Sequence, residues 1–100
     1  MKFIVEFRKE ALQDILEAIS WYEFQLEGLG DEFFISLENS KHQIEQNPLQ
    51  FPQKYKGIRK SIISRFPYII YYKIEEPNKV LVLAVLHMKR GPQAVKKKTK

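Results

Sequence analysis

The chain has 100 residues, of which 44% are hydrophobic and 13% aromatic, a composition typical of one folded domain and not of a disordered segment. It contains no cysteine, which excludes disulfide bonds and thiolate metal sites. Residues 1–50 hold ten acidic and four basic side chains (net −6), whereas residues 51–100 hold two acidic and thirteen basic ones (net +11). This division predicts one face suited to a polyanion or an acidic partner, although a basic end such as Lys96–Lys100 can also serve solubility alone.

The first half of the chain predicts a short strand and then two helices. Lys2–Phe7 alternates and is rich in strand-forming residues, and from Glu10 onward the apolar residues recur at helical spacing. The segment Gly28-Leu29-Gly30 should end the first helix, because glycine accepts the left-handed conformation found at helix ends. A second helix should follow and end at Asn47-Pro48, because proline disfavours helical geometry in the residue before it.

So short a connection predicts that the two helices form an antiparallel hairpin. Its packing residues are predicted to include four aromatic side chains: Trp21, Tyr22, Phe33 and Phe34. His42 falls on the polar side of the second helix and is predicted to be a surface residue.

The second half predicts three strands after a proline-containing loop over Pro48–Gly57. The strands are Ile58–Ser64, Tyr68–Glu75 and Lys79–His87, each rich in Ile, Val or Tyr. The two connections between them are short, contain proline and suit hairpins. The last run is apolar at both parities, which indicates an interior strand covered on both faces. The helices can cover one face, so something else should cover part of the other.

These elements predict an α+β fold in the order β-α-α-β-β-β, with a helical hairpin packed on a mostly antiparallel sheet. We expect a single domain over residues 1–95 and a mobile basic tail over residues 96–100. No apolar run approaches membrane-spanning length and the first ten residues do not suit a signal peptide, so a cytoplasmic location is expected. Neither a metal nor a cofactor is expected.

Several short segments follow one another in a recognisable order across residues 2–92. They are Ala11-Leu12-Gln13-Asp14-Ile15 leading to Trp21-Tyr22-Glu23, Gly28-Leu29-Gly30 followed by Phe33 or Phe34, Asn47-Pro48, Arg59, Arg65-Phe66-Pro67-Tyr68-Ile69-Ile70-Tyr71-Tyr72, and Ala84-Val85-Leu86-His87 with Arg90 and Pro92. In this order and at this spacing they resemble the RelE/ParE family of bacterial toxins from type II toxin–antitoxin pairs. The resemblance implies a toxin that is neutralised by a small antitoxin encoded beside it.

The resemblance leaves the target open, because a shared fold does not choose between activities. RelE-like members of the family cleave messenger RNA in the ribosome, whereas ParE-like members inhibit DNA gyrase and are not nucleases. Ribosome-dependent nucleases of the family usually carry an aromatic residue at or just after the active-site position of the last strand. No aromatic residue follows His87, since the chain continues Met88-Lys89-Arg90-Gly91-Pro92. The leading hypothesis is therefore a ParE-like toxin of the plasmid-stabilisation type.

The alternatives are a ribosome-dependent endoribonuclease and a non-toxic basic module that binds nucleic acid. Metal-free RNA cleavage needs a base, an acid and cations around the phosphate. His87 is the candidate acid or base. Arg59 and Arg65 are predicted to share one face of their strand and to flank a phosphate there. His87 and Arg65 would be the catalytic pair if the protein is a nuclease.

A wider set of residues is predicted to bind the target, whichever it is: Arg59, Arg65, Tyr72, His87 and Arg90. Arg90 would complete the cationic cluster or contact an acidic antitoxin. Either Tyr72 or Tyr71 should be exposed and offer a hydroxyl or a surface on which a base stacks. The structural alternatives are that His87 caps the end of its strand and that the arginines are solvated at a sheet edge.

The resemblance also predicts where the antitoxin binds. The apolar second face near Val80–Leu86 and the grooves of the helical hairpin should be covered by an antitoxin segment that adds a helix or a strand.

Overall fold

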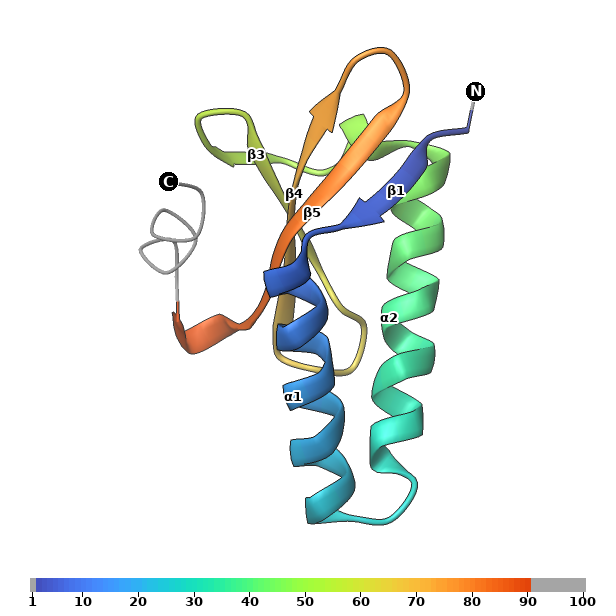
Figure 1. Cartoon of the computed structure of the whole chain (residues 1–100), viewed down its shortest axis with the longest axis vertical. Coiled ribbons are helices and arrows are strands. Elements are labelled where there is room, and N and C mark those ends of the chain that lie inside the picture. Colours follow the sequence, from blue (N-terminus) through green and yellow to red (C-terminus); the bar gives the residue numbers. More distant parts are fainter. Residues whose placement is uncertain (1, 91–100) are drawn as a thin grey trace.

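The computed structural model describes residues 2–90, in which a pair of helices packs on a five-stranded mixed sheet (Figure 1). The predicted α+β class and the order strand, two helices, strands are confirmed. In chain order the elements are β1 (Ile4–Phe7), α1 (Lys9–Gln25), α2 (Leu29–Gln46), a 3₁₀ turn (Pro48–Gln50), β2 (Gln53–Tyr55), β3 (Ile58–Ile62), β4 (Tyr68–Glu75), β5 (Lys79–His87) and a second 3₁₀ turn (Met88–Arg90).

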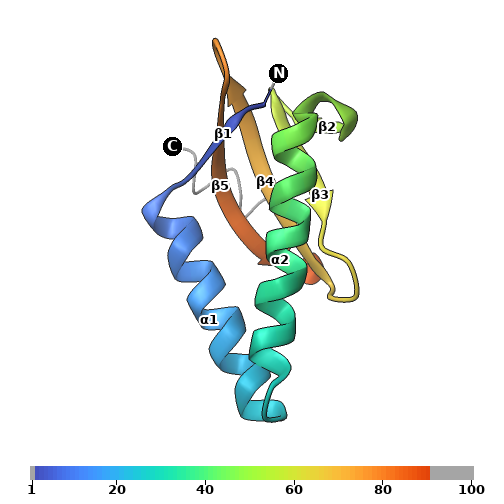
Figure 2. The ribbon, with the colours of Figure 1, turned by 90° about the vertical axis from the view of Figure 1, so that its right-hand side faces the viewer.

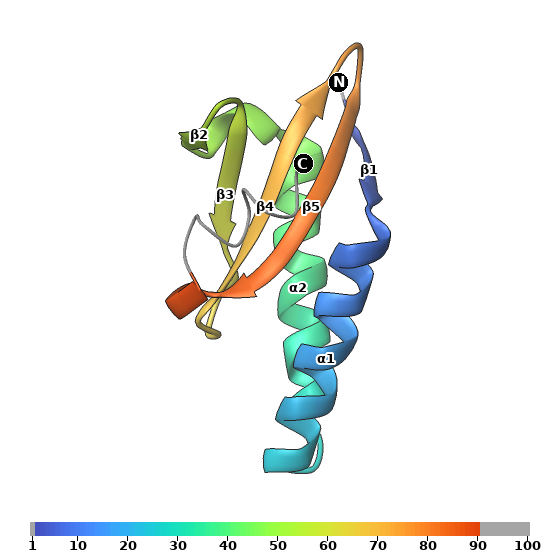
Figure 3. The same cartoon turned by 60° about the vertical axis from the view of Figure 1, so that its left-hand side comes forward.

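The strands lie in the order β1-β5-β4-β3-β2. β1 is parallel to β5, and every other neighbouring pair is antiparallel, so β5 is the interior strand that its apolar sequence predicts. β1 is short and pairs with β5 only from Lys79 to Val82. α2 runs along the sheet (Figure 2), and the tip of the helical hairpin extends past the ends of the strands (Figure 3).

Two predictions about the bounds of loops and strands are wrong. The predicted loop Pro48–Gly57 contains β2, a three-residue strand too short to show periodicity, which pairs with β3. The predicted strand Ile58–Ser64 ends at Ile62, and the chain then turns through Ser64 and Arg65, with Arg65 in a left-handed conformation (φ 73°). The predicted tail, residues 96–100, lies outside the described residues.

The main core lies between the helices and one face of the sheet. Its buried members are Ala11, Ile15, Ala18, Phe33, Leu37, Ile44, Ile63, Phe66, Ile70, Tyr72, Val80, Val82 and Val85. β5 is apolar at both parities because both of its faces are buried, and a bulge shifts the alternation along it. Tyr71 lies opposite Ala84 and Tyr72 opposite Val82, which leaves Leu83 without a partner on β4. Residues before and after the bulge therefore reach the helices out of strict alternation.

The opposite face of the sheet carries a second buried cluster, formed by Ile58, Ile69, Tyr71, Leu83, Ala84 and Leu86. We predicted an open apolar surface near Val80–Leu86, but Leu83 and Leu86 are only 3% and 2% exposed. Tyr55 and Leu81 pack against this cluster from its margin. This face therefore offers an antitoxin less apolar surface than the sequence suggests.

The N-terminus of α2 has no capping side chain at its N-cap position, which is Gly28. A glutamate of α1 bonds to its free backbone N–H groups instead. Glu23 of α1 accepts hydrogen bonds from the backbone N–H groups of Gly28 (3.0 Å) and Gly30 (3.0 Å), so it serves as the cap of α2. Gly28 has φ 88°, and a Cβ at Gly30 would lie 2.9 Å from the carbonyl oxygen of Ile19. Both glycines are therefore required by the turn.

Tyr72 is a core residue, and the prediction that it or Tyr71 is exposed is wrong for both. Its side chain is 0% exposed and its hydroxyl donates a 2.6 Å hydrogen bond to the carbonyl oxygen of Pro48. Tyr72 lies on the helix-facing side of β4, and Tyr71 lies in the second cluster. Burial raises the pKa of Tyr72 to about 12, with a smaller opposing effect of Arg59.

Tyr72→Phe should lower the free energy of unfolding by about 1–2 kcal/mol at neutral pH, because the Pro48 carbonyl loses its donor. The folded-state pKa lies above the ordinary value of 10, so this group stabilises the fold fully below pH 10 and loses that contribution as pH rises toward 12. Urea unfolding at pH 8 and pH 11 should therefore show a smaller difference between wild type and variant at the higher pH. A difference that stays constant would contradict the assignment.

Candidate functional site

Arg59 holds the β2 region onto the sheet. Its guanidinium donates a 2.6 Å hydrogen bond to the carbonyl oxygen of Phe51 and a longer one to that of Leu49. Arg59 also lies opposite Tyr72 in the pairing of β3 with β4. The structure therefore gives this side chain a structural partner at the margin of the sheet.

Arg65 does not share a strand face with Arg59, so that prediction is wrong. It lies in the turn between β3 and β4, where its guanidinium pairs with Glu32 of α2 at 3.0 Å. Both side chains of the pair are exposed, and a surface pair of this kind contributes about 0–1 kcal/mol. An anionic partner could therefore displace Glu32 at little cost.

His87 ends β5 and is half-buried, as expected for a histidine at a strand end. Its Nδ1 accepts a 3.1 Å hydrogen bond from the backbone N–H of Lys89, and its ring contacts that of Tyr68 edge to face at 5.4 Å. This is the capping arrangement that we held open as the structural alternative. Arg90 is the last residue of the 3₁₀ turn Met88–Arg90. His42 is exposed, as predicted.

Four of the predicted site residues, Arg59, Arg65, Tyr72 and His87, therefore do not form one cluster. Arg59 contacts the loop before β2, Arg65 contacts α2, Tyr72 is buried, and His87 contacts Tyr68. His87 lines a cleft.

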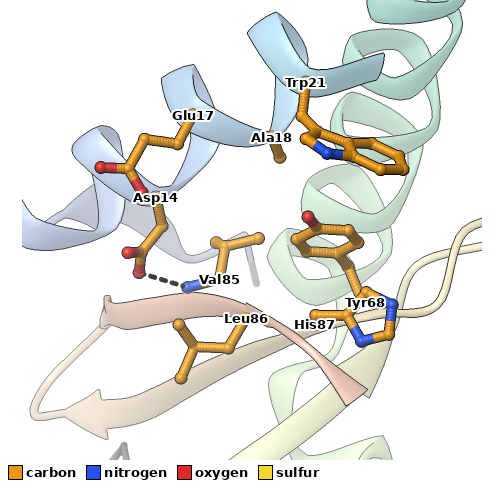
Figure 4. A pocket seen from close by; sticks show the side chains of 8 residues that line it. All are labelled: Asp14, Glu17, Ala18, Trp21, Tyr68, Val85, Leu86 and His87. Carbon is orange, nitrogen blue, oxygen red and sulfur yellow. Dashed lines mark hydrogen bonds between the residues drawn. The ribbon is translucent and has the colours of Figure 1, made fainter. Parts of the chain in front are cut away.

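That cleft has a volume of about 200 Å³ and lies between α1 and the ends of β4 and β5 (Figure 4). Asp14, Glu17 and Trp21 line it from α1, and Tyr68 and His87 line it from the sheet. A neighbouring hollow of about 440 Å³ shares Trp21, Tyr68 and His87 and adds Tyr22 and Pro67. We call the 200 Å³ space the acidic–aromatic cleft.

Asp14 stabilises β5 at one end of the acidic–aromatic cleft. One of its carboxylate oxygens accepts a 3.0 Å hydrogen bond from the backbone N–H of Val85 (Figure 4). That N–H belongs to the part of β5 that extends beyond β1, so a side chain replaces the missing strand partner. Burial, and then the charges of Asp14 and Glu17, raise the pKa of Tyr68, and both carboxylates line the cleft with it.

The aromatic residues of the hairpin divide between core and surface. Phe33 is buried, and Tyr22 is stacked on it with 5.5 Å between ring centroids, as predicted for packing residues. Trp21 and Phe34, however, are 56% and 47% exposed, so the prediction that they are packing residues is wrong. Trp21 lines the acidic–aromatic cleft, and Phe34 lines a groove on the hairpin.

This second concave surface, the hairpin groove, has a volume of about 310 Å³ and is almost entirely apolar. Its lining residues are Phe7, Leu12, Ile15, Leu16, Ile19, Phe34, Leu37 and Glu38. Leu12 and Leu16 belong to the apolar residues that recur at helical spacing in α1, but both are exposed here. Exposed apolar side chains gathered in one groove are typical of a surface that binds another protein.

A third surface, the basic cleft, lies beside the second buried cluster and has a volume of about 460 Å³. Arg8, Lys56 and Lys73 line it together with Tyr55, above a floor of Ile58, Leu81 and Leu83. The Nζ of Lys56 lies 5.6 Å from the centre of the Tyr55 ring. Cations beside an aromatic ring suit a nucleic-acid strand or an acidic segment. Sequence reasoning missed this cleft because its cations come from three separate segments.

Among residues 2–90 no group of three or more potential metal ligands comes together. Within the same residues no helix is long and apolar enough to cross a membrane.

Comparison with known proteins places the chain in a family. Residues 5–92 match the family described as the ParE toxin of the type II toxin–antitoxin system parDE. No curated protein sequence matches the chain significantly. The chain belongs to the ParE toxin family.

Solved structures show the same fold at low sequence identity. The chromosomal ParDE toxin–antitoxin system of P. aeruginosa matches with a TM-score of 0.75 at 12% identity, covering 86% of this chain and 96% of that chain. A mutant of the E. coli toxin RelE in the free state gives 0.71 at 17% identity, with coverages of 98% and 94%. The RelBE2 toxin–antitoxin complex of Mycobacterium tuberculosis gives 0.63 at 18% identity, with coverages of 87% and 99%. The RelE/ParE fold predicted from the sequence is confirmed.

Asp14→Ala should lower the free energy of unfolding by about 1–3 kcal/mol, because it leaves the buried N–H of Val85 without its acceptor. Asp14→Asn is the matched control, since its amide oxygen can still accept the bond. Urea unfolding followed by circular dichroism should rank the variants wild type, Asn, Ala in decreasing stability. Equal stability of the two variants would show that the hydrogen bond contributes nothing.

Proposed function

We propose that the protein is the toxin of a type II toxin–antitoxin system and arrests growth by binding an essential macromolecular target such as DNA gyrase. A cognate antitoxin neutralises it. Membership of the ParE toxin family supports the toxin assignment. The structural neighbours include two toxin–antitoxin systems, which supports an antitoxin partner. Binding of the target, with no chemical step, is the mode of action that the site supports best.

The observation that carries this choice is the dispersal of the groups that RNA cleavage would need. A nuclease must place base, acid and cations around one phosphate. Here His87 accepts the N–H of Lys89, Arg65 pairs with Glu32, and Arg59 donates to backbone carbonyls. Each group has a different intramolecular partner from a different element. Such an arrangement favours a binding surface over a nuclease centre.

The hairpin groove is the proposed docking site of the antitoxin. An amphipathic helix can lay its apolar face into a groove of this kind, with anchor residues at helical spacing. Leu16 is 60% exposed there, and burying it against a partner removes apolar surface from water. This half of the predicted antitoxin surface is therefore retained, whereas the second face of the sheet is mostly closed.

The basic cleft favours a second candidate, the basic module that binds nucleic acid. Its three cations and Tyr55 could track an RNA strand, with stacking on the ring and contacts to the phosphates. It lacks an acid–base pair among its lining residues in the described part of the chain. It therefore supports nucleic-acid contact more than cleavage.

Induced expression in a bacterial host should arrest growth, and co-expression of the antitoxin encoded beside the gene should relieve the arrest. Mapping of transcript ends shortly after induction should show no codon-linked cuts. The double variant His87→Ala/Arg65→Ala should still arrest growth, because neither residue performs chemistry. Codon-linked cuts that disappear in the double variant would establish the nuclease instead.

Leu16→Glu should weaken binding of the cognate antitoxin by about tenfold or more, because it places a charge in the centre of an apolar contact. Leu49→Glu is the matched control, since Leu49 is equally exposed but does not line the groove. Titration calorimetry with both purified variants measures the effect. Equal weakening by the two substitutions would place the antitoxin elsewhere.

A further inference from the structure

The acidic–aromatic cleft is an acidic site on a protein whose net charge is +5. Two carboxylates line it, and within residues 2–90 no lysine or arginine lines it or the hollow beside it. The pKa of Tyr68 is raised first by burial and then by Asp14 and Glu17, so the negative potential reaches the aromatic wall. A phosphate group would be repelled here, and a cation would be attracted.

The walls of the acidic–aromatic cleft are aromatic rings that face its interior. Trp21 projects from α1 toward Tyr68 on the opposite side of the space, with His87 beside Tyr68 (Figure 4). Trp21 is more than half exposed, so its large apolar surface is left in water in the free protein. A flat cation that stacks on these rings gains cation–π attraction and removes that surface from water.

The volume of the acidic–aromatic cleft limits what can enter it. About 200 Å³ is below the range of about 300–1,000 Å³ typical of pockets for whole small molecules. It suits one side chain of a larger partner, whose neighbouring residues can lie over the adjoining hollow of about 440 Å³. Tryptophan, tyrosine and arginine are the residues that most often form the energetic centres of protein interfaces, and they frequently pair with one another.

We propose that the acidic–aromatic cleft is the receptor for one arginine side chain of a polypeptide partner, held between Trp21 and Tyr68 with its guanidinium toward Glu17. The planar guanidinium matches both the rings and the carboxylate, which an ammonium group does less well. The inference rests on the geometry and charge of the cleft and does not depend on toxin activity.

Trp21 is the only tryptophan of the chain, so its fluorescence and its indole N–H resonance report on this cleft and on the hollow beside it. The probe is N-acetyl-arginine amide, and its neutral isostere N-acetyl-citrulline amide is the comparison. We expect the arginine probe to perturb Trp21 with a dissociation constant of about 1 mM, as suits so small a ligand. The citrulline probe should bind about tenfold more weakly, because it lacks the charge.

Glu17→Gln should weaken binding of the arginine probe about fivefold, because it removes the exposed carboxylate of the cleft. Glu27→Gln is the matched control, since it makes the same charge change at an exposed position outside the cleft. Both variants should unfold at the wild-type urea concentration, because both side chains are exposed.

Three results would overturn the proposal. Equal binding of the citrulline probe would remove the role of charge. Tighter binding of guanosine monophosphate than of the arginine probe would identify a nucleobase slot. No change at Trp21 up to about ten times the expected dissociation constant would show that the cleft binds no isolated arginine side chain.

Discussion

The constraint on which the site depends is the mismatch in length between β1 and β5. β1 has four residues and pairs with the first part of β5, whereas β5 has nine and continues to His87. The backbone N–H of Arg8 still bonds to Val82, and α1 begins at the next residue. A helix therefore lies beside the rest of β5 in place of a strand. Asp14 of that helix caps Val85, and the space farther along becomes the acidic–aromatic cleft.

This constraint also explains why Asp14 is buried in a helix that faces the sheet. An interior strand whose edge lacks a partner strand leaves backbone groups to be satisfied, and an uncapped buried N–H is costly. One carboxylate supplies the acceptor and, by its charge, gives the cleft its polarity. Asp14 therefore both stabilises β5 and contributes negative charge to the cleft. Glu17 is exposed and adds a second negative charge to the lining of the cleft.

The sequence predicts the elements of this fold well because each depends on local pattern. The bounds of β4 and β5 follow from runs rich in Ile, Val and Tyr between prolines, and the hairpin follows from Gly28 and the helical spacing around it. What sequence cannot show is how the elements meet. The bulge at Leu83 depends on pairing with Tyr71 and Tyr72, and it decides which side chains reach the helices. Burial of Tyr72 depends on a carbonyl 24 positions away.

The candidate site was only partly predictable, because sequence does not show how the elements meet. Charge summed over halves of the chain points to the basic second half, yet the cleft combines acids of the first half with Tyr68 and His87 of the second. A signal was present, because Asp14, Glu17 and Trp21 share one face of α1 at helical spacing. That face could be recognised as a stripe, but its position beside the end of β5 follows only from the length of β1.

α1 lines a different concave surface on each side of its buried stripe. Its buried stripe includes the small residues Ala11 and Ala18, which allow the helix to approach the sheet closely. Leu12 and Leu16 lie on the flank that faces the hairpin groove, and Glu17 and Trp21 lie on the flank that faces the acidic–aromatic cleft. A polypeptide that crosses α1 would meet the apolar hairpin groove and then the two carboxylates of the acidic–aromatic cleft. Protein interfaces combine apolar anchors with a few charged contacts in this way, whereas a polyanion would find no attraction here. The cations of the basic cleft lie beside the opposite face of the sheet, so the two concave flanks of α1 and the basic cleft open on different sides of one small domain.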